Sequence, residues 1–137
     1  MYILDTNVIS ELRKAAKTHQ NVRKWAERLP SASLYISVVS VLELEIGILL
    51  IERRDKAQGA ILRAWMDRHV LPTFSGRVLA IDTAVAQRCA TLHVPNPRSD
   101  RDALIAATAL VHGLTVATRN VADFERTEVA VLNPWEA

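Results

Sequence analysis

Five short, almost uniformly apolar segments alternate with longer segments of helical character along this chain. Strands that are apolar on both sides need cover on both faces, which is typical of parallel sheets built from βαβ units. The sequence therefore predicts an α/β fold with a central parallel sheet and helices on either side. The five expected strands are Tyr2–Leu4, Leu34–Ser37, Val78–Ile81, Leu114–Thr118 and Val129–Leu132.

The segments between these strands carry start and stop signals of helices. Asn21 and Asp82 are expected N-caps, Pro30 ends one helix, and Gly113 stands where a helix C-terminal glycine is expected. With no repeat and no Gly/Ser/Pro linker, residues 1–137 are expected to form a single domain. The expected helices are Ser10–Ala16, Asn21–Leu29, Val41–Arg54, Ala57–His69, a helix from Asp82 to about Leu92, and Ala103–His112.

Composition narrows the class of protein. Cys89 is the only cysteine, so no internal disulfide is expected, which suits a reducing cytosol. The apolar runs fall short of the ~20 residues that a membrane span needs, and no secretory signal is readable. We therefore expect a soluble, cytoplasmic protein without a membrane segment. The formal charge of +2 is too small to identify a nucleic-acid binder.

Two aspartates follow the expected strands directly. Asp5 ends the first strand, and Asp123 comes within one loop of the fourth strand, which ends at Thr118. In open parallel sheets, ligands bind beyond the carboxyl ends of the strands, so both positions are candidates for a functional site. The alternative for Asp5 is a helix N-cap, and for Asp123 a turn or a helix cap.

Two further acids lie on expected helices. Helical geometry points Glu43 to an apolar face together with Gly47, whereas Glu45 points with Glu52. A lone acid on an apolar face is costly unless it is paired or bound to a cation, and Arg54 is a candidate partner for Glu43. Asp102 opens the helical run DALIAATALVHG, where a capping-box role with Ser99 is the alternative. Asp100 is ambiguous in the same way.

A parallel sheet can bring these four elements to one edge. Converging carboxylates repel each other and persist only if they stay protonated or if cations fill the cluster. Oxygen ligands without a matching His or Cys cluster select Mg²⁺ or Mn²⁺. The four histidines have no HxxxH spacing, so zinc is not expected.

The acidic segments YILDTN, SVLELEIG, DALIAATAL and TRNVADF occur in this order over nearly the whole chain. Together they resemble PIN-domain nucleases, and in particular the VapC/FitB-type toxins of bacterial toxin–antitoxin pairs. The resemblance implies a PIN-like three-layer fold with the sheet order 3-2-1-4-5. It places the family's acids on Asp5, Glu43, Asp102 and Asp123, and its polar partners on Thr6, Asn7, Thr118 and Asn120.

The resemblance also implies an activity: a metal-dependent endoribonuclease that acts as the toxin of a type II toxin–antitoxin system. Asp5, Asp102 and Asp123 would hold Mg²⁺ or Mn²⁺, and Glu43 would bind the metal or orient its water. Asp100 is the one extra acid whose membership the sequence leaves open.

The implied partners are an RNA substrate, a small antitoxin whose tail would enter the active-site groove, and a second copy of the chain. A candidate dimer surface is the helix face that carries Val41, Glu45, Ile48 and Glu52.

Two other functions remain open on the sequence. A non-catalytic, partner-binding PIN-like protein would use the acids only as caps or for a structural cation. A metal-dependent phosphatase on a similar α/β fold would usually have a DxD motif after its first strand. Here Asp5 is followed by Thr6 and Asn7, which disfavours that alternative.

Overall fold

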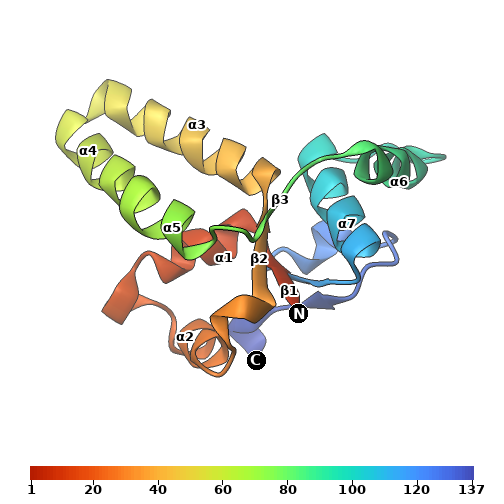
Figure 1. Cartoon of the computed structure of the whole chain (residues 1–137), viewed down its shortest axis with the longest axis horizontal. Helices are drawn as coiled ribbons and strands as arrows, with labels where there is room; N and C mark the ends of the chain where they lie inside the picture. The colour runs from red at the N-terminus through yellow and green to blue at the C-terminus, as the bar shows by residue number, and fades with distance from the viewer.

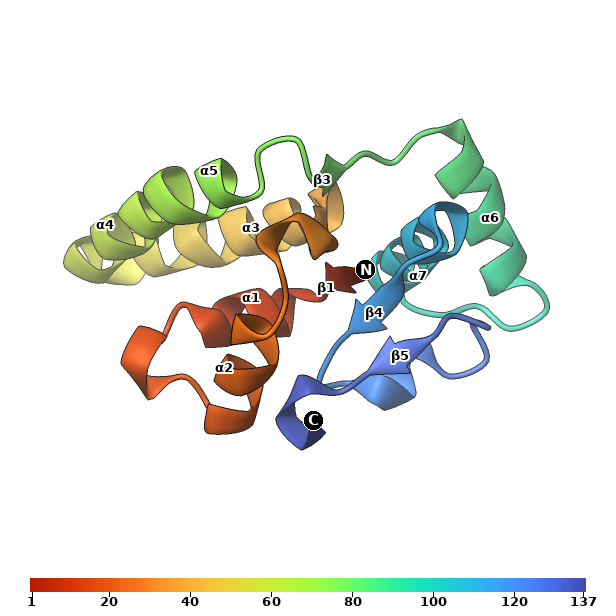
Figure 2. The same cartoon turned by 60° about the horizontal axis from the view of Figure 1, so that its bottom comes forward.

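The computed structural model describes all residues, 1–137, and contains one five-stranded parallel sheet. Its strand order is β3-β2-β1-β4-β5, which confirms the predicted α/β fold and the predicted order. Figure 2 shows β1, β4 and β5 lying side by side with their arrows pointing the same way. The strands are β1 Tyr2–Leu4, β2 Leu34–Ser37, β3 Val78–Leu79, β4 Thr115–Ala117 and β5 Val131–Leu132.

Helices connect the strands and cover both faces of the sheet (Figure 1). A π-helical turn, η3 (Met66–Val70), joins α4 to α5, and the short 3-10 helices are η1 (Ala15–Lys17), η2 (Ser31–Ser33), η4 (Val121–Phe124) and η5 (Pro134–Glu136). The α-helices are α1 Thr6–Leu12, α2 Gln20–Glu27, α3 Val38–Arg54, α4 Lys56–Trp65, α5 Leu71–Thr73, α6 Thr83–His93 and α7 Asp100–His112.

The central strand β1 shows how the layers arise. Successive side chains of a strand point to opposite faces. Leu4 packs into the core beneath α1–α5, and its neighbour Ile3 packs into the core beneath α7. On the second side Ala106 and Ala109 are fully buried, so α7 lies close against the sheet. Because the carboxyl ends of β1 and β4 are in register, with Leu4 opposite Ala117, the residues that follow them meet at one edge.

The hairpin of α3 and α4 overturns one prediction. Ile48 is buried, and Arg63 of α4 pairs with both Glu45 (2.7 Å) and Glu52 (3.5 Å). The face with Val41, Glu45, Ile48 and Glu52 is therefore covered within the chain and is not a free dimer surface. The exposed apolar side chains of α3 lie elsewhere, at Val38, Leu42, Leu49 and Leu50.

Several helix starts also differ from prediction. The helix expected from Val41 begins at Val38, and the helix expected from Ala103 begins at Asp100. The first helix begins at Thr6 and not at Ser10, because Asp5 accepts a hydrogen bond from the Thr6 backbone N–H and caps it. The N-cap of α2 is His19, whose Nδ1 accepts from the backbone N–H of Asn21. The Asn21 amide instead donates to the carbonyl of Trp135 (2.6 Å), so it joins α2 to the C-terminal η5.

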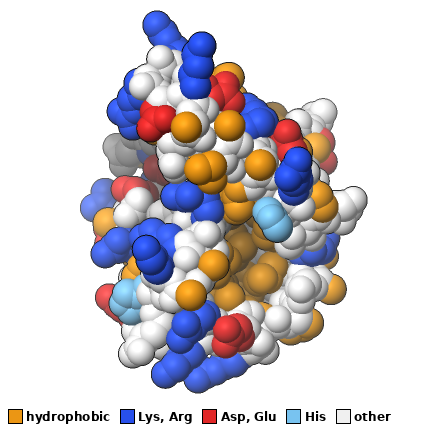
Figure 3. All heavy atoms as spheres, turned by 90° about the vertical axis from the view of Figure 1, so that its left-hand side faces the viewer, with side chains coloured by type: hydrophobic (Ala, Val, Ile, Leu, Met, Phe, Trp, Pro, Cys, Tyr) orange, Lys and Arg blue, Asp and Glu red, His pale blue; other side chains and the backbone are white.

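Cys89 is buried as a free thiol in the small core between α6 and α7. Burial raises the pKa of the Cys89 thiol, which keeps it protonated and unreactive at neutral pH. No helix in the chain has both the length and the apolar character needed to cross a membrane. Figure 3 shows hydrophobic side chains gathered in a hollow on the side of the molecule that carries the α3–α4 hairpin.

Candidate active site

Asp5 is the fixed point of the site. It lies between the end of β1 and the start of α1 and is only 7% exposed. Its Oδ1 accepts from the Thr6 backbone N–H (2.8 Å), and its Oδ2 accepts from the Thr118 hydroxyl (2.8 Å). The N-cap interpretation is therefore correct. It uses one carboxylate oxygen, while the second faces β4.

A small polar network holds the Asp5 carboxylate in place. Asn7 donates through Nδ2 to Asp5 Oδ2 (3.3 Å) and to the Thr118 hydroxyl (3.2 Å). Asn120 donates its backbone N–H to the same hydroxyl (3.0 Å), and Arg119 donates its backbone N–H to Asn7 Oδ1 (3.3 Å). Thr118 itself is fully buried. These hydrogen bonds tie the loop after β4 to the start of α1, and they also orient Asp5.

Glu43 reaches the same edge from α3. Its Oε1 accepts from the Thr6 hydroxyl (2.8 Å), and its Oε2 lies 3.8 Å from the Arg101 guanidinium. The Thr6 hydroxyl also contacts the buried Ser40 hydroxyl at 3.1 Å. The expected alternative partner, Arg54, is not the one found: the arginine beside Glu43 comes from the first turn of α7.

Asp102 lies in the first turn of α7, where the helix dipole favours a negative charge. Nevertheless burial raises the pKa of Asp102, and the neighbouring carboxylates of Asp5, Asp123 and Glu43 raise it further, to about 6. Desolvation and like charge therefore outweigh the dipole. The Ser99 side chain makes no capping hydrogen bond to the helix backbone, and its hydrogen bond with Asp102 lowers the pKa of this acid without offsetting the rise.

Asp5 experiences the same crowding. Burial raises its pKa above the usual range, with added contributions from the charges of Glu43 and Asp123, and the hydrogen bonds from Thr118 and Thr6 oppose this rise. Four acids from four separate elements are thus electrostatic neighbours.

Asp123 is the most open member of the group. It lies in η4, is exposed, and borders a shallow cavity of about 670 Å³ that Arg119, Asn120 and Asn133 also line. The side chain of Asn120 makes no hydrogen bond, and its contribution to the network comes from its backbone.

Asp100 lies apart from these four carboxylates. Its side chain is 92% exposed and stands 3.5 Å from His93, and it does not contribute to the pKa shifts of Asp5 or Asp102.

The donor set suits a hard divalent cation. The carboxylates of Asp5, Asp102 and Asp123 form no ion pair, and the one ion pair of the group joins Arg101 to Glu43. No three acidic, His or Cys side chains converge closely enough to form a ready-made metal cage. Mg²⁺ does not require such a cage, because it usually keeps several waters and is held by one or two carboxylates together with substrate phosphates.

Sequence reasoning missed two residues of this edge. Ser40 lies one helical turn before Glu43, so the spacing i, i+3 on α3 was a signal that could have found it. Arg101 had no comparable signal, because its proximity to Glu43 depends on how α7 packs against α3.

Comparisons with known proteins give a consistent result. The model of the PIN domain family matches residues 2–130. Toxin FitB of Neisseria gonorrhoeae is 36% identical, with 98% of this chain and 99% of that protein aligned. VapC ribonuclease Y4jK of Sinorhizobium fredii is also 36% identical, over 99% of both chains. Among solved structures, that of FitAcB from Neisseria gonorrhoeae covers 100% of both chains with 35% identity and a TM-score of 0.90.

Proposed function

Because the chain belongs to the PIN-domain family, we propose that it is a metal-dependent endoribonuclease that acts as the toxin of a toxin–antitoxin pair. The observation that carries this proposal is the group of unpaired acids at one sheet edge. Burial and three neighbouring carboxylates raise the pKa of Asp102 to about 6. Such crowding is costly for folding, and it is the arrangement that a bound divalent cation would stabilise. The relatives named as a toxin and as a ribonuclease support the choice of substrate.

The residues that would hold Mg²⁺ or Mn²⁺ are Asp5, Asp102 and Asp123, and Glu43 would lie at the edge of this metal site. When bound, the cation supplies a polarised water and charge stabilisation at the scissile phosphate. In hydrolysis the water oxygen would bond to phosphorus and give up a proton, the bond to the leaving ribose oxygen would break, and that oxygen would take up a proton. A bound cation would also neutralise four of the 15 acidic residues, so the 17 basic residues would outnumber the remaining acids more strongly. The protein would then be a better match for a polyanion.

The surrounding residues have distinct tasks in this scheme. Thr118 and the Thr6 backbone N–H fix the Asp5 carboxylate, and Asn7 keeps the two loops together. Glu43 is held through its Oε1 by Thr6, so its Oε2 is the oxygen that can orient a water. Arg101, 3.8 Å from that oxygen, is a cation placed to contact a substrate phosphate.

An antitoxin is the proposed protein partner, since a chain in a solved toxin–antitoxin complex from Klebsiella pneumoniae is similar to this one, with 25% identity and a TM-score of 0.70. A groove of about 440 Å³ leads from the site between α1, α3 and α4. Its walls begin at Thr6 and Glu43 and continue over Gly47, Leu50 and Ile51, so a segment lying there would reach the acids. A second copy of the chain remains a proposed partner, and the exposed apolar side chains of α3 are the surface it would use.

Cleavage of RNA tests the activity directly. The purified chain should cut single-stranded RNA in Mg²⁺ or Mn²⁺, and EDTA should stop it. Asp5→Asn should lower the rate by more than about 100-fold, because it removes a metal-holding charge. Full activity in EDTA would contradict the metal mechanism. A folded parent chain with no activity on RNA, but with activity on a phosphomonoester, would favour the phosphatase instead.

A further inference from the structure

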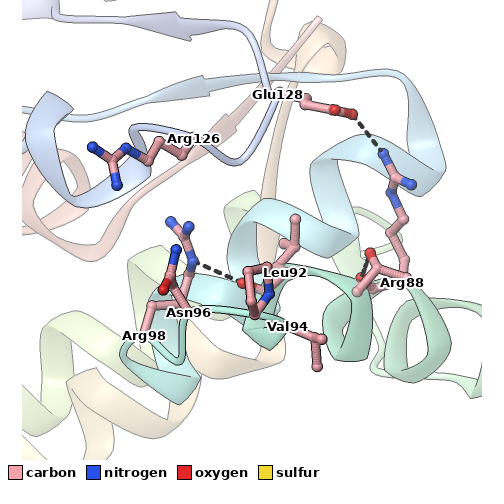
Figure 4. A pocket seen from close by; sticks show the side chains of 9 residues that line it. Arg88, Leu92, Val94, Asn96, Arg98, Arg126 and Glu128 are labelled. Atoms are coloured by element: carbon pink, nitrogen blue, oxygen red, sulfur yellow. Dashed lines mark hydrogen bonds and ion pairs between the residues drawn. The ribbon is translucent and has the colours of Figure 1, made fainter.

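A second polar feature lies beside the acid cluster. A cavity of about 350 Å³ opens between the end of α6, the loop of residues 94–98 and the loop that follows η4. Three arginines line it, Arg88, Arg98 and Arg126, and Glu128 is the one acidic residue among them. Figure 4 shows Arg98 and Arg126 on one side of this opening and the pair of Arg88 and Glu128 on the other. We call it the arginine notch.

The three guanidinium groups are held to different degrees. Arg98 donates to the carbonyls of Leu92 (Nε, 3.0 Å) and Glu125 (2.8 Å), so its fork is fixed while one nitrogen stays unused. Arg88 contacts Glu128 at 3.4 Å, and the Glu128 side chain is 80% exposed. Arg126 is exposed and makes no hydrogen bond or ion pair. The notch therefore presents a positioned guanidinium at Arg98, a free one at Arg126 and a weakly paired one at Arg88.

The notch adjoins the proposed active site through two chain segments. Arg98 comes four residues before Asp102, and Arg126 comes three residues after Asp123. Even fully extended, these segments span no more than ~14 Å and ~11 Å, which places the notch within a few nucleotides of the acids. The Arg98 contact with Glu125 joins the two segments directly.

We propose that the arginine notch binds a backbone phosphate of the RNA strand, away from the bond that is cut. This rests on the proposed nuclease function and adds a substrate-positioning site to it. Guanidinium groups match phosphate geometry, and the phosphodiester monoanion is the anion that recurs at regular intervals along the substrate. Glu128 pairs with Arg88 in the free protein. It therefore acts as a competing anion that the RNA must displace.

Binding of a fluorescein-labelled single-stranded RNA of mixed sequence, followed by anisotropy in the Asp5→Asn background, tests the assignment. Arg126→Gln should weaken binding about five- to tenfold and reduce the salt slope by about 0.7, as loss of one phosphate contact does for single strands. Glu128→Gln should tighten binding severalfold, because it frees Arg88. The matched controls are Arg53→Gln, at the far end of α3, and Glu27→Gln in α2, since both residues are exposed and form no ion pair.

The outcomes separate this inference from the function on which it rests. If Arg126→Gln binds like Arg53→Gln and Glu128→Gln binds like Glu27→Gln, while the parent still cuts RNA, the notch assignment is wrong and the nuclease proposal stands. If the parent neither binds nor cuts RNA, both are wrong. A competition series with inorganic phosphate distinguishes a free-anion site: displacement of RNA at micromolar phosphate would overturn the RNA assignment, and weak displacement supports it.

Discussion

Two groups of acidic residues in this molecule have the same chemistry and opposite surroundings. At the α3–α4 hairpin, Arg63 is surrounded by Glu45 and Glu52 of α3 and by Asp67 of η3, at 2.7, 3.5 and 3.9 Å. At the sheet edge, Asp5, Asp102 and Asp123 have no basic partner. The first group raises the pKa of its arginine through the hydrogen bond from Arg63 to Glu45, whereas the second raises the pKa of Asp102. Pairing marks the first group as structural, and the lack of pairing in the second is the basis for proposing that it takes an external cation.

The two glutamates of α3 allow the largest contrast between these groups. Glu43 and Glu45 are two residues apart on one helix, but one contacts Thr6 at the site and the other contacts Arg63. Glu43→Gln should lower RNA cleavage by about 100-fold or more, as loss of a water-orienting acid does. Glu45→Gln should leave the rate within about twofold, because its carboxylate lies in the other group.

Comparison of initial rates for these two variants at saturating Mn²⁺ is the measurement. Equal losses would mean that the hairpin group also serves the reaction. An inactive Glu45→Gln beside an active Glu43→Gln would reverse the assignment made for α3.

Removal of Arg63, the cation at the centre of the hairpin group, should have a smaller effect than the loss of Glu43, and it should affect stability alone. Arg63→Gln leaves three carboxylates close together without their partner. Because the Arg63 side chain is about a third exposed, we expect a loss of about 1–2 kcal/mol in the free energy of unfolding, or roughly 3–8 °C in the melting midpoint. Arg53→Gln is the matched control, since Arg53 forms no ion pair. A midpoint equal to that of the control would show that Arg63 does not stabilise the hairpin.

Some of this architecture follows from sequence because its cause is local. The uniformly apolar segments predicted β1 and β2 with the observed bounds. The predicted N-cap Asp82 accepts a hydrogen bond from the backbone N–H of Val85 at the start of α6. The predicted C-terminal glycine, Gly113, ends α7 with a positive φ of 67°. Asp5 shows a limit of the same reasoning. An N-cap role was considered for its carboxylate, but the first helix was expected only from Ser10, although it begins at Thr6.

The rest depended on packing between distant segments. The face of α3 with Glu45 and Ile48 looked like a docking surface because nothing in its own sequence shows that α4 folds back over it. The partner of Glu43 was likewise decided by α7, which lies far along the chain. The strand ends that carry Asp5 and Thr118 were predictable, because parallel topology alone brings them to one edge.

The pH dependence of the metal-free protein has a defined sign. The pKa of Asp102 is raised from its ordinary value of 3.8 to about 6, so between these values the folded state binds more protons than the unfolded chain. The stability that this acid contributes is complete below about pH 4 and is lost as the pH rises through about 6. Protons and metal compete for the same oxygens, so Mn²⁺ affinity should fall as the pH drops below about 6.

Thermal unfolding of the parent chain and Asp102→Asn, each with EDTA and with saturating Mn²⁺ at pH 7.5, tests the central claim most directly. Mn²⁺ at a hundredfold its dissociation constant should stabilise the parent by roughly 2.7 kcal/mol. In EDTA, Asp102→Asn should melt about one or two degrees higher than the parent, because one of four crowded charges is gone, and its Mn²⁺ shift should be much smaller. A variant that melts lower than the parent in EDTA and keeps the full Mn²⁺ shift would contradict the account, since Asp102 would then be a structural acid.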